Sequence, residues 1–275
     1  MSAEPPLPLA EGLAARRRPG AGDQVLWIHG YTLDSTSWQD LWDRLPGWSH
    51  IGLDLPGHGA SRPLAPDEDL PSLARCIGRA AAGEGVRHLV ALSFGTIVAL
   101  QVAIEHPGAF ASVTLGAPAL GGGPQDPEAE RLYAVLLDLY RQRGRGPHLD
   151  ALWLGAESPI FRGLDRGSGL WRQIAALVER HGWGELATSA MGRLTAHPQS
   201  RRDLGSVRAA MLVLVGDRDM VAFRRSAEIL RRSVPAAERL YLPGAGHLCL
   251  LEEPERTACL LSAHLRRHAE RPPAP

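Results

Sequence analysis

The chain has 275 residues, of which 44% are hydrophobic, and its basic and acidic side chains balance to a formal net charge of +0. This length and apolar content are enough for one large domain, or two small ones, with a buried core. A balanced charge argues against a nucleic-acid partner, because nucleic-acid-binding domains carry a basic face. All 30 basic residues are arginine, which excludes a lysine Schiff base and a phosphate-loop lysine.

The cysteine content and the hydropathy pattern bear on the location of the protein. The chain has an odd number of cysteines, Cys76, Cys249 and Cys259, and they form no C-x-x-C motif. This pattern is typical of a reduced, intracellular protein. The first 20 residues contain no apolar leader segment, and no run of about 18 apolar residues occurs. We therefore expect a cytoplasmic protein that does not bind membranes.

Short apolar runs alternate with helical patterns over the first part of the chain. Residues 1–11 are rich in proline, and we expect them to be irregular. Residues 12–18 are expected to form a hairpin with a buried strand at 25–30. In chain order, a helix is predicted at 35–45, a strand at 49–55, a helix at 70–85, a strand at 87–92, a helix at 94–106 and a strand at 110–118.

The pattern changes in the middle of the chain. Residues 119–206 contain helical patterns and no convincing strand, and the strand–helix alternation resumes after residue 207. The helical patterns cover 128–143, 148–155, 170–181 and 184–196, and the resumed alternation has strands at 209–216 and 238–244 and helices at 224–234 and 253–268.

Strands that alternate with helices predict an α/β fold with a parallel sheet covered by helices on both faces. We interpret residues 1–118 and 207–275 as one core domain and residues 119–206 as a helical cap inserted into it. The insertion is expected at the carboxyl edge of the sheet, where such sheets bind ligands. We therefore expect the cap to influence substrate choice, with one or two of Trp153, Trp171 and Trp183 facing the cleft.

Ser93 lies in VALSFGTIV (90–98), where a strand pattern changes abruptly into a helical one. Such a turn lifts a serine hydroxyl above the sheet and aims it at the start of the following helix. The turn requires small residues two positions before and two positions after the serine, and Ala91 and Gly95 satisfy this requirement. A serine that only caps the helix is the alternative. We interpret Ser93 as the candidate nucleophile.

A serine nucleophile needs a histidine base that is oriented by a carboxylate. His247 lies in LPGAGHL (242–248), after the last predicted strand and on the same sheet edge as Ser93. A surface-loop histidine is the alternative reading of this residue. We interpret His247 as the candidate base.

Two aspartates are candidates for the carboxylate that orients the histidine. The strand at 209–216 is followed by Asp217 and Asp219, and either could serve only to close a turn. Asp219 is followed by the apolar pair Met220 and Val221, which indicates that the chain turns back toward buried surface there. A carboxylate screened from water could bind the histidine N–H tightly, so we favour Asp219.

Taken together, these segments resemble the α/β-hydrolase fold superfamily over most of the chain. The matching segments are HGY (29–31), DLPGHGAS (54–61), LSFG (92–95), GDRDMV (216–221) and GAGH (244–247). One departure is Ala91, where the G-x-S-x-G motif has its first glycine. The resemblance implies an eight-stranded, mostly parallel sheet, a helical cap at 119–206, and a triad in the order Ser93, Asp219, His247.

The same resemblance suggests further site residues. The backbone N–H groups of Tyr31 and Phe94 are the implied oxyanion hole. Met220, Leu250 and Trp153 are candidate liners of the substrate pocket. His29 and His58 lie in family loop motifs away from the serine, and we expect them to be structural.

These features predict a serine hydrolase that cleaves a carboxylic ester of a small to medium-sized substrate through an acyl-enzyme. A lactonase, a thioesterase, a C–C bond hydrolase and a cofactor-free perhydrolase remain alternatives on the same triad. A ligand-binding protein without activity is less favoured, because all three triad positions are filled. The histidines show no metal-ligand spacing, so we expect neither a metal nor a cofactor. The expected partner is a small ester-like molecule, and the oligomeric state stays open.

Overall fold

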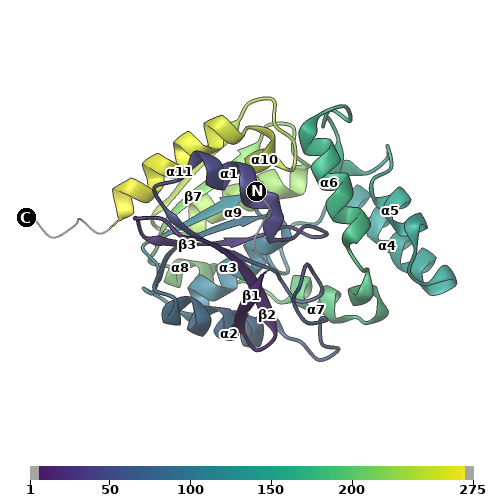
Figure 1. Ribbon diagram of the computed structural model, residues 1–275, viewed down its shortest axis with the longest axis horizontal. Coiled ribbons are helices and arrows are strands. Elements are labelled where there is room, and N and C mark those ends of the chain that lie inside the picture. The colour runs from purple at the N-terminus through teal and green to yellow at the C-terminus, as the bar shows by residue number, and fades with distance from the viewer. Residues whose placement is uncertain (1–5, 270–275) are drawn as a thin grey trace, which may run out of the picture.

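An eight-stranded sheet runs through the middle of the computed structural model, which describes residues 6–269 (Figure 1). The eight strands, the mostly parallel pairing and the α/β class confirm the predicted fold. In spatial order the strands are β1 (Leu7–Ala10), β2 (Leu13–Arg18), β4 (Ser49–Leu53), β3 (Gln24–Ile28), β5 (Val86–Leu92), β6 (Ser112–Gly116), β7 (Ala210–Gly216) and β8 (Ala237–Leu242).

The first strands differ from the expected arrangement in two ways. β1 is a strand where irregular structure was predicted, and Pro8 is tolerated because β1 lies at the edge of the sheet and pairs only with β2. The predicted hairpin between 12–18 and 25–30 is wrong, because β2 pairs with β1 and β4. The backbone of β3 is already paired on both sides by β4 and β5, so it leaves no free edge for β2.

The two faces of the sheet contribute to two separate hydrophobic clusters. Leu26 and Ile28 of β3 point into one cluster, and Val25 and Trp27 point into the other, as the two-residue period of a strand requires. Figure 1 shows α1 and α11 on one side of the sheet and α2, α3 and α8 on the other. The core helices are α1 (Gln39–Arg44), α2 (Leu70–Gly83), α3 (Phe94–Glu105), α9 (Val221–Ser233), α10 (Cys249–Glu252) and α11 (Pro254–His268), with a 3₁₀ turn η1 (Ser35–Trp38) before α1.

Between β6 and β7 the chain contains only helices, and we call residues 119–206 the cap segment. Figure 1 shows α4, α5 and α6 of this segment grouped beyond one end of the sheet. Its elements are α4 (Pro127–Arg143), α5 (Pro147–Trp153), η2 (Pro159–Phe161), α6 (Gly169–Arg180), η3 (Gly184–Ala187), α7 (Ala190–Ala196) and α8 (Arg201–Ser206). Helix α8 was not predicted, although its capping box of Ser200 and Asp203 is a readable signal. Within residues 6–269, no helix has both the length and the apolar character needed to cross a membrane.

His50 of β4 is buried beneath the tryptophans of β3 and α1. Its Nδ1 accepts a hydrogen bond from Trp27 Nε1–H at 3.1 Å, and its Nε2–H donates to the carbonyl of Leu45 at 2.9 Å. The Trp42 ring stacks on the imidazole with a centroid distance of 5.3 Å. Because Nδ1 already faces an N–H donor, a second proton there would have no acceptor. Burial accordingly lowers the pKa of His50 to about 4.

We expect the protein to lose stability as the pH falls from about 6.5 to 4. In the unfolded chain His50 has a pKa near 6.5, so the unfolded state binds the proton first in this window and the folded state is disfavoured. The full shift corresponds to about 3 kcal/mol. Urea unfolding of the wild type and of His50→Gln at pH 7.5 and 4.5 tests this. The glutamine can replace both hydrogen bonds without titrating, so it should lose about 2 kcal/mol less than the wild type. Equal losses in the two proteins would contradict the assignment.

Candidate active site

The strand-to-helix corner at Ser93 is strained. Ser93 has φ 52° and ψ −123°, a conformation that residues with a side chain rarely adopt and that costs about 1–3 kcal/mol. The corner is held on both sides, because Ser93 N–H donates to Gly116 O at 2.9 Å and Thr96 N–H donates to Ser93 O at 2.8 Å. The serine therefore projects from the end of β5 at the start of α3, where the motif predicted it.

Close contacts with neighbouring backbone explain why the residues around the corner must be small. A Cβ on Gly95 would lie 2.4 Å from the carbonyl oxygen of His29 and 2.6 Å from that of Ile28. The end of β3 thus presses directly against the first turn of α3. Ala91 is fully buried in β5, opposite Ile28 and Leu115 of the neighbouring strands.

Three predicted residues form one hydrogen-bonded line. Ser93 Oγ lies 2.8 Å from His247 Nε2, and His247 Nδ1 lies 2.9 Å from Asp219 Oδ1. Ser93 follows β5, Asp219 follows β7 and His247 follows β8. Since carboxyl ends of parallel strands meet at one edge of a sheet, residues far apart in sequence come together here. His247 and Asp219 are each 3% exposed.

The two neighbouring aspartates lie in different environments. Asp219 is buried, and besides His247 its Oδ1 accepts a hydrogen bond from Met220 N–H at 2.7 Å. Its Oδ2 has no hydrogen-bond partner in the part of the chain that the structure describes. Asp217 is exposed and accepts the N–H of Gly244 at 2.8 Å, so it joins the ends of β7 and β8.

The loop that carries His247 has two supports that sequence reasoning missed. Glu252 of α10 accepts the N–H of Gly246 at 2.8 Å, and burial raises the pKa of this carboxyl. The Phe223 ring lies edge-on to the imidazole of His247, with centroids 4.3 Å apart. No local motif marks either residue, because both contacts depend on how α9 and α10 pack.

The two candidate oxyanion donors are free to bind. Within residues 6–269, neither Tyr31 N–H nor Phe94 N–H donates a hydrogen bond. Phe94 opens α3, where the N–H groups have no partner in the helix and the helix dipole favours negative charge. The turn that carries Tyr31 passes close to the serine, since a Cβ on Gly30 would lie 3.3 Å from Ser93 Cβ.

An apolar cavity of about 490 Å³ opens at Ser93. Trp153 lines it, as predicted, whereas Trp171 and Trp183 do not. The remaining liners come from both the core and the cap segment: Tyr31, Ser93, Phe94, Ile97, Ala119, Leu120, Pro124, Gln125, Asp126, Ala129, Glu130, Tyr133, Ala134, Leu137, Met191, Gly192, Thr195, Ala222 and Phe223. No arginine or histidine lines the cavity among the described residues.

The other two predicted liners, Met220 and Leu250, do not line this cavity. Leu250 is fully buried against β6, where a Cβ on Gly116 would lie 2.3 Å from its Cγ. Met220 is buried at the start of α9, and its backbone binds Asp219. Both residues therefore lie next to the candidate acid and base in the sequence but outside the lining of the cavity.

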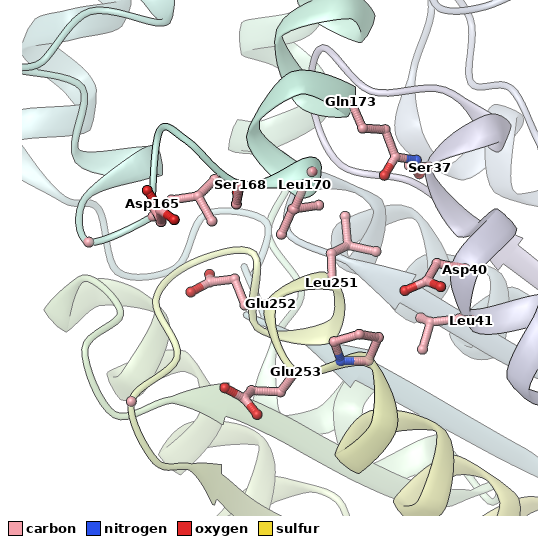
Figure 2. A pocket seen from close by; sticks show the side chains of 15 residues that line it. Ser37, Asp40, Leu41, Asp165, Ser168, Leu170, Gln173, Leu251, Glu252 and Glu253 are labelled. Atoms are coloured by element: carbon pink, nitrogen blue, oxygen red, sulfur yellow. The ribbon is translucent and has the colours of Figure 1, made fainter.

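A second cavity, of about 560 Å³, lies between α1, the start of α6 and the segment that joins α10 to α11 (Figure 2). In Figure 2, Leu170 and Leu251 approach each other across it, and Asp40, Asp165 and Glu253 lie around it. It contains neither Ser93 nor His247, so its larger volume does not make it the reaction site. Residues 6–269 contain no group of three or more His, Cys, Asp or Glu side chains arranged to hold a metal ion.

Comparisons with known proteins agree with this geometry. Residues 25–258 match the sequence model of the Alpha/beta hydrolase family. Over 250 residues the chain is 26% identical to 2-succinyl-6-hydroxy-2,4-cyclohexadiene-1-carboxylate synthase of Escherichia coli O1:K1, covering 88% of this chain and 93% of the relative.

Two solved structures share the fold. A thermophilic esterase from Thermogutta terrifontis superposes with a TM-score of 0.75 and 24% identity, covering 94% of this chain and 95% of the other. MenH from S. aureus superposes with a TM-score of 0.79 and 18% identity, covering 92% and 98%. At these identities the likeness establishes the fold alone.

We expect Gly95→Ala to reduce the free energy of unfolding by about 1–3 kcal/mol, because the added methyl group would overlap two backbone carbonyls that cannot move freely. Gly83→Ala at the end of α2 is the matched control, since a Cβ there meets no atom within 4 Å. That control should change stability by no more than about 0.5 kcal/mol. Urea unfolding measures both variants, and equal stability would show that the corner tolerates a side chain.

Proposed function

The chain belongs to the alpha/beta hydrolase family, and we propose that it is a serine hydrolase that cleaves a carboxylic ester of a small to medium-sized substrate. One observation carries the proposal: the unbroken hydrogen-bonded line from Asp219 through His247 to Ser93, ending at an apolar cavity. The proposed chemistry proceeds through an acyl-enzyme and needs no cofactor.

In the first half-reaction, Ser93 Oγ attacks the ester carbonyl carbon while its proton passes to His247 Nε2. The contact of 2.9 Å between Nδ1 and Asp219 fixes the tautomer, because an N–H at Nδ1 leaves Nε2 as the acceptor. The carbonyl π electrons move to the oxygen, and the negative charge of Asp219 stabilises the imidazolium. Collapse of the tetrahedral intermediate breaks the C–O bond, and His247 returns the proton to the leaving alcohol.

In the second half-reaction, water takes the position of the alcohol. His247 Nε2 accepts one proton from the water as its oxygen attacks the acyl carbon, and the acyl–Ser93 bond then breaks. The proton returns to Ser93 Oγ, so the enzyme is restored and the acid leaves. In both steps the N–H groups of Tyr31 and Phe94 are the proposed donors to the oxyanion.

The cavity favours an uncharged, largely apolar acyl group. Its liners are mostly aliphatic and aromatic, and its two charged side chains, Asp126 and Glu130, are both acidic. The relative from Escherichia coli is named for a carboxylate product, and such an anion is usually bound by arginine. Since none of the described arginines lines this cavity, an ester hydrolase fits the site better than a synthase of that kind.

We expect Ser93→Ala to lower ester turnover by about 10⁴-fold or more without loss of folding, because the nucleophile is removed and the buried core is untouched. The assay is a panel of esters, lactones and thioesters with graded, neutral and anionic acyl groups. A fluorophosphonate should label the wild type at Ser93 and leave the variant unlabelled, while thermal unfolding checks the fold. Labelling of another serine, or turnover that survives the substitution, would exclude Ser93 as the nucleophile.

We expect Asp219→Asn to lower kcat by about 10³–10⁴-fold, as loss of the orienting carboxylate does in serine triads. Asp217→Asn is the matched control, since it removes a carboxylate two residues away whose bond is to Gly244 N–H. It should cost about 1 kcal/mol of stability or less and leave kcat nearly normal. The reverse pattern in the kinetics of the two purified variants would show that the acid has been assigned to the wrong residue.

A further inference from the structure

We propose that Glu185 of the cap segment is a positioning residue that holds Tyr31 in place, so that the cap segment controls the geometry of the oxyanion hole. The inference rests on the proposed function, because it assumes that Tyr31 N–H binds the oxyanion. It adds a role for a carboxylate that lies outside the triad and reaches the site from a different part of the chain.

A direct hydrogen bond joins the two residues across 154 positions of sequence. The Tyr31 hydroxyl donates to Glu185 Oε1 at 2.6 Å. Tyr31 follows β3 in the core, whereas Glu185 lies in η3 of the cap segment. Glu185 is 1% exposed, and His181 Nε2 lies 3.1 Å from the same oxygen. Its other oxygen, Oε2, has no partner in the part of the chain that the structure describes.

Such a buried carboxylate is costly for stability unless hydrogen bonds or paired charges compensate, because burial removes its hydration. Burial alone would raise the pKa of Glu185. The hydrogen bonds with His181 and Tyr31 outweigh this effect, so the pKa of the carboxyl lies below its ordinary value. The pKa of Tyr31 is raised well above its ordinary range by burial and by the nearby carboxylate. The pair is therefore an ionised acceptor and a protonated donor, which is the strong form of this hydrogen bond.

The ring of Tyr31 is fixed by its neighbours as well as by its hydroxyl. Five rings surround it edge-on, with centroids 5.3–6.2 Å away, and four of them come from the cap segment. These rings belong to His58, Tyr133, Trp153, His181 and Trp183.

Both chain segments that meet in this contact are strained. Thr32, next to Tyr31, has φ 61°, and Trp183, two residues before Glu185, has φ 53°. A positive φ is a genuine outlier for β-branched or bulky residues, and it persists only where the surroundings enforce it. Trp153 Nε1–H donates to Thr32 Oγ1 at 3.0 Å, which adds a second tie from the cap segment to the same turn.

The consequence for catalysis follows from the geometry that an oxyanion hole demands. Its donors act only if they point at the oxygen within a few tenths of an ångström, and a displacement of about 1 Å can cost about 10²-fold in rate. The Tyr31 backbone lies in a strained turn, and its own side chain is anchored in the cap segment. A loss of the Glu185 contact should therefore release the Tyr31 N–H and lower kcat more than it changes KM.

The test uses the full-length protein and a neutral aryl ester that the wild type hydrolyses. Tyr31→Phe and Glu185→Ala should each lower kcat by about tenfold or more with KM within about twofold, and the double variant should be no slower than the slower single one. Glu185→Gln should restore most of the rate, because its amide oxygen can accept the same hydrogen bond. Gln173→Ala, which removes a cap-to-core hydrogen bond to Thr36 O outside the lining of the serine cavity, should keep the wild-type kcat.

The outcomes separate this inference from the proposed function. A wild type that neither hydrolyses esters nor reacts with a fluorophosphonate overturns both. An active wild type whose Tyr31→Phe variant keeps full kcat overturns only the role of Glu185, and so does a rise in KM alone. If Glu185→Ala fails to fold, Tyr31→Phe still decides, because it removes the same hydrogen bond without opening a cavity.

Discussion

The backbone of Ser93 is held in a conformation that residues with a side chain rarely adopt, and the geometry of the site depends on the packing that keeps it there. Two hydrogen bonds fix the corner, and the absence of a side chain at Gly95 lets the carbonyls of His29 and Ile28 approach α3. The same approach brings the turn with Gly30 and Tyr31 beside the serine. One steric constraint therefore places both the proposed nucleophile and the two proposed oxyanion donors.

The polar groups of the site lie among apolar neighbours, and this raises the strength of each interaction. Asp219 and His247 are nearly inaccessible to water, so their hydrogen bond acts in a medium that screens charge weakly. Leaving Asp219 Oδ2 without a partner is costly for stability. Among the described residues Glu185 shows the same pattern, since one of its buried carboxylate oxygens also has no hydrogen-bond partner.

The sequence predicted the features that depend on local patterns and missed those that depend on long-range packing. The fold class, the corner at Ser93 and the meeting of Ser93, Asp219 and His247 follow from alternation and spacing. The hairpin between 12–18 and 25–30 failed because β4, which comes later in the chain, lies between these strands. Glu185 carried no signal, because its partner Tyr31 is 154 residues away and no motif spans that distance.

Family membership fixes the fold but leaves the reaction open, and the proposed choice of substrate rests on the residues that line the cavity. The chain carries 30 cationic side chains, all arginine, and none of those described lines the cavity at Ser93. Several arginines instead pair with carboxylates elsewhere, as Arg17 does with Glu84 and Arg62 with Glu68. Arginine is absent from the described lining of the cavity, and this observation supports the proposed preference for an uncharged acyl group over a carboxylate.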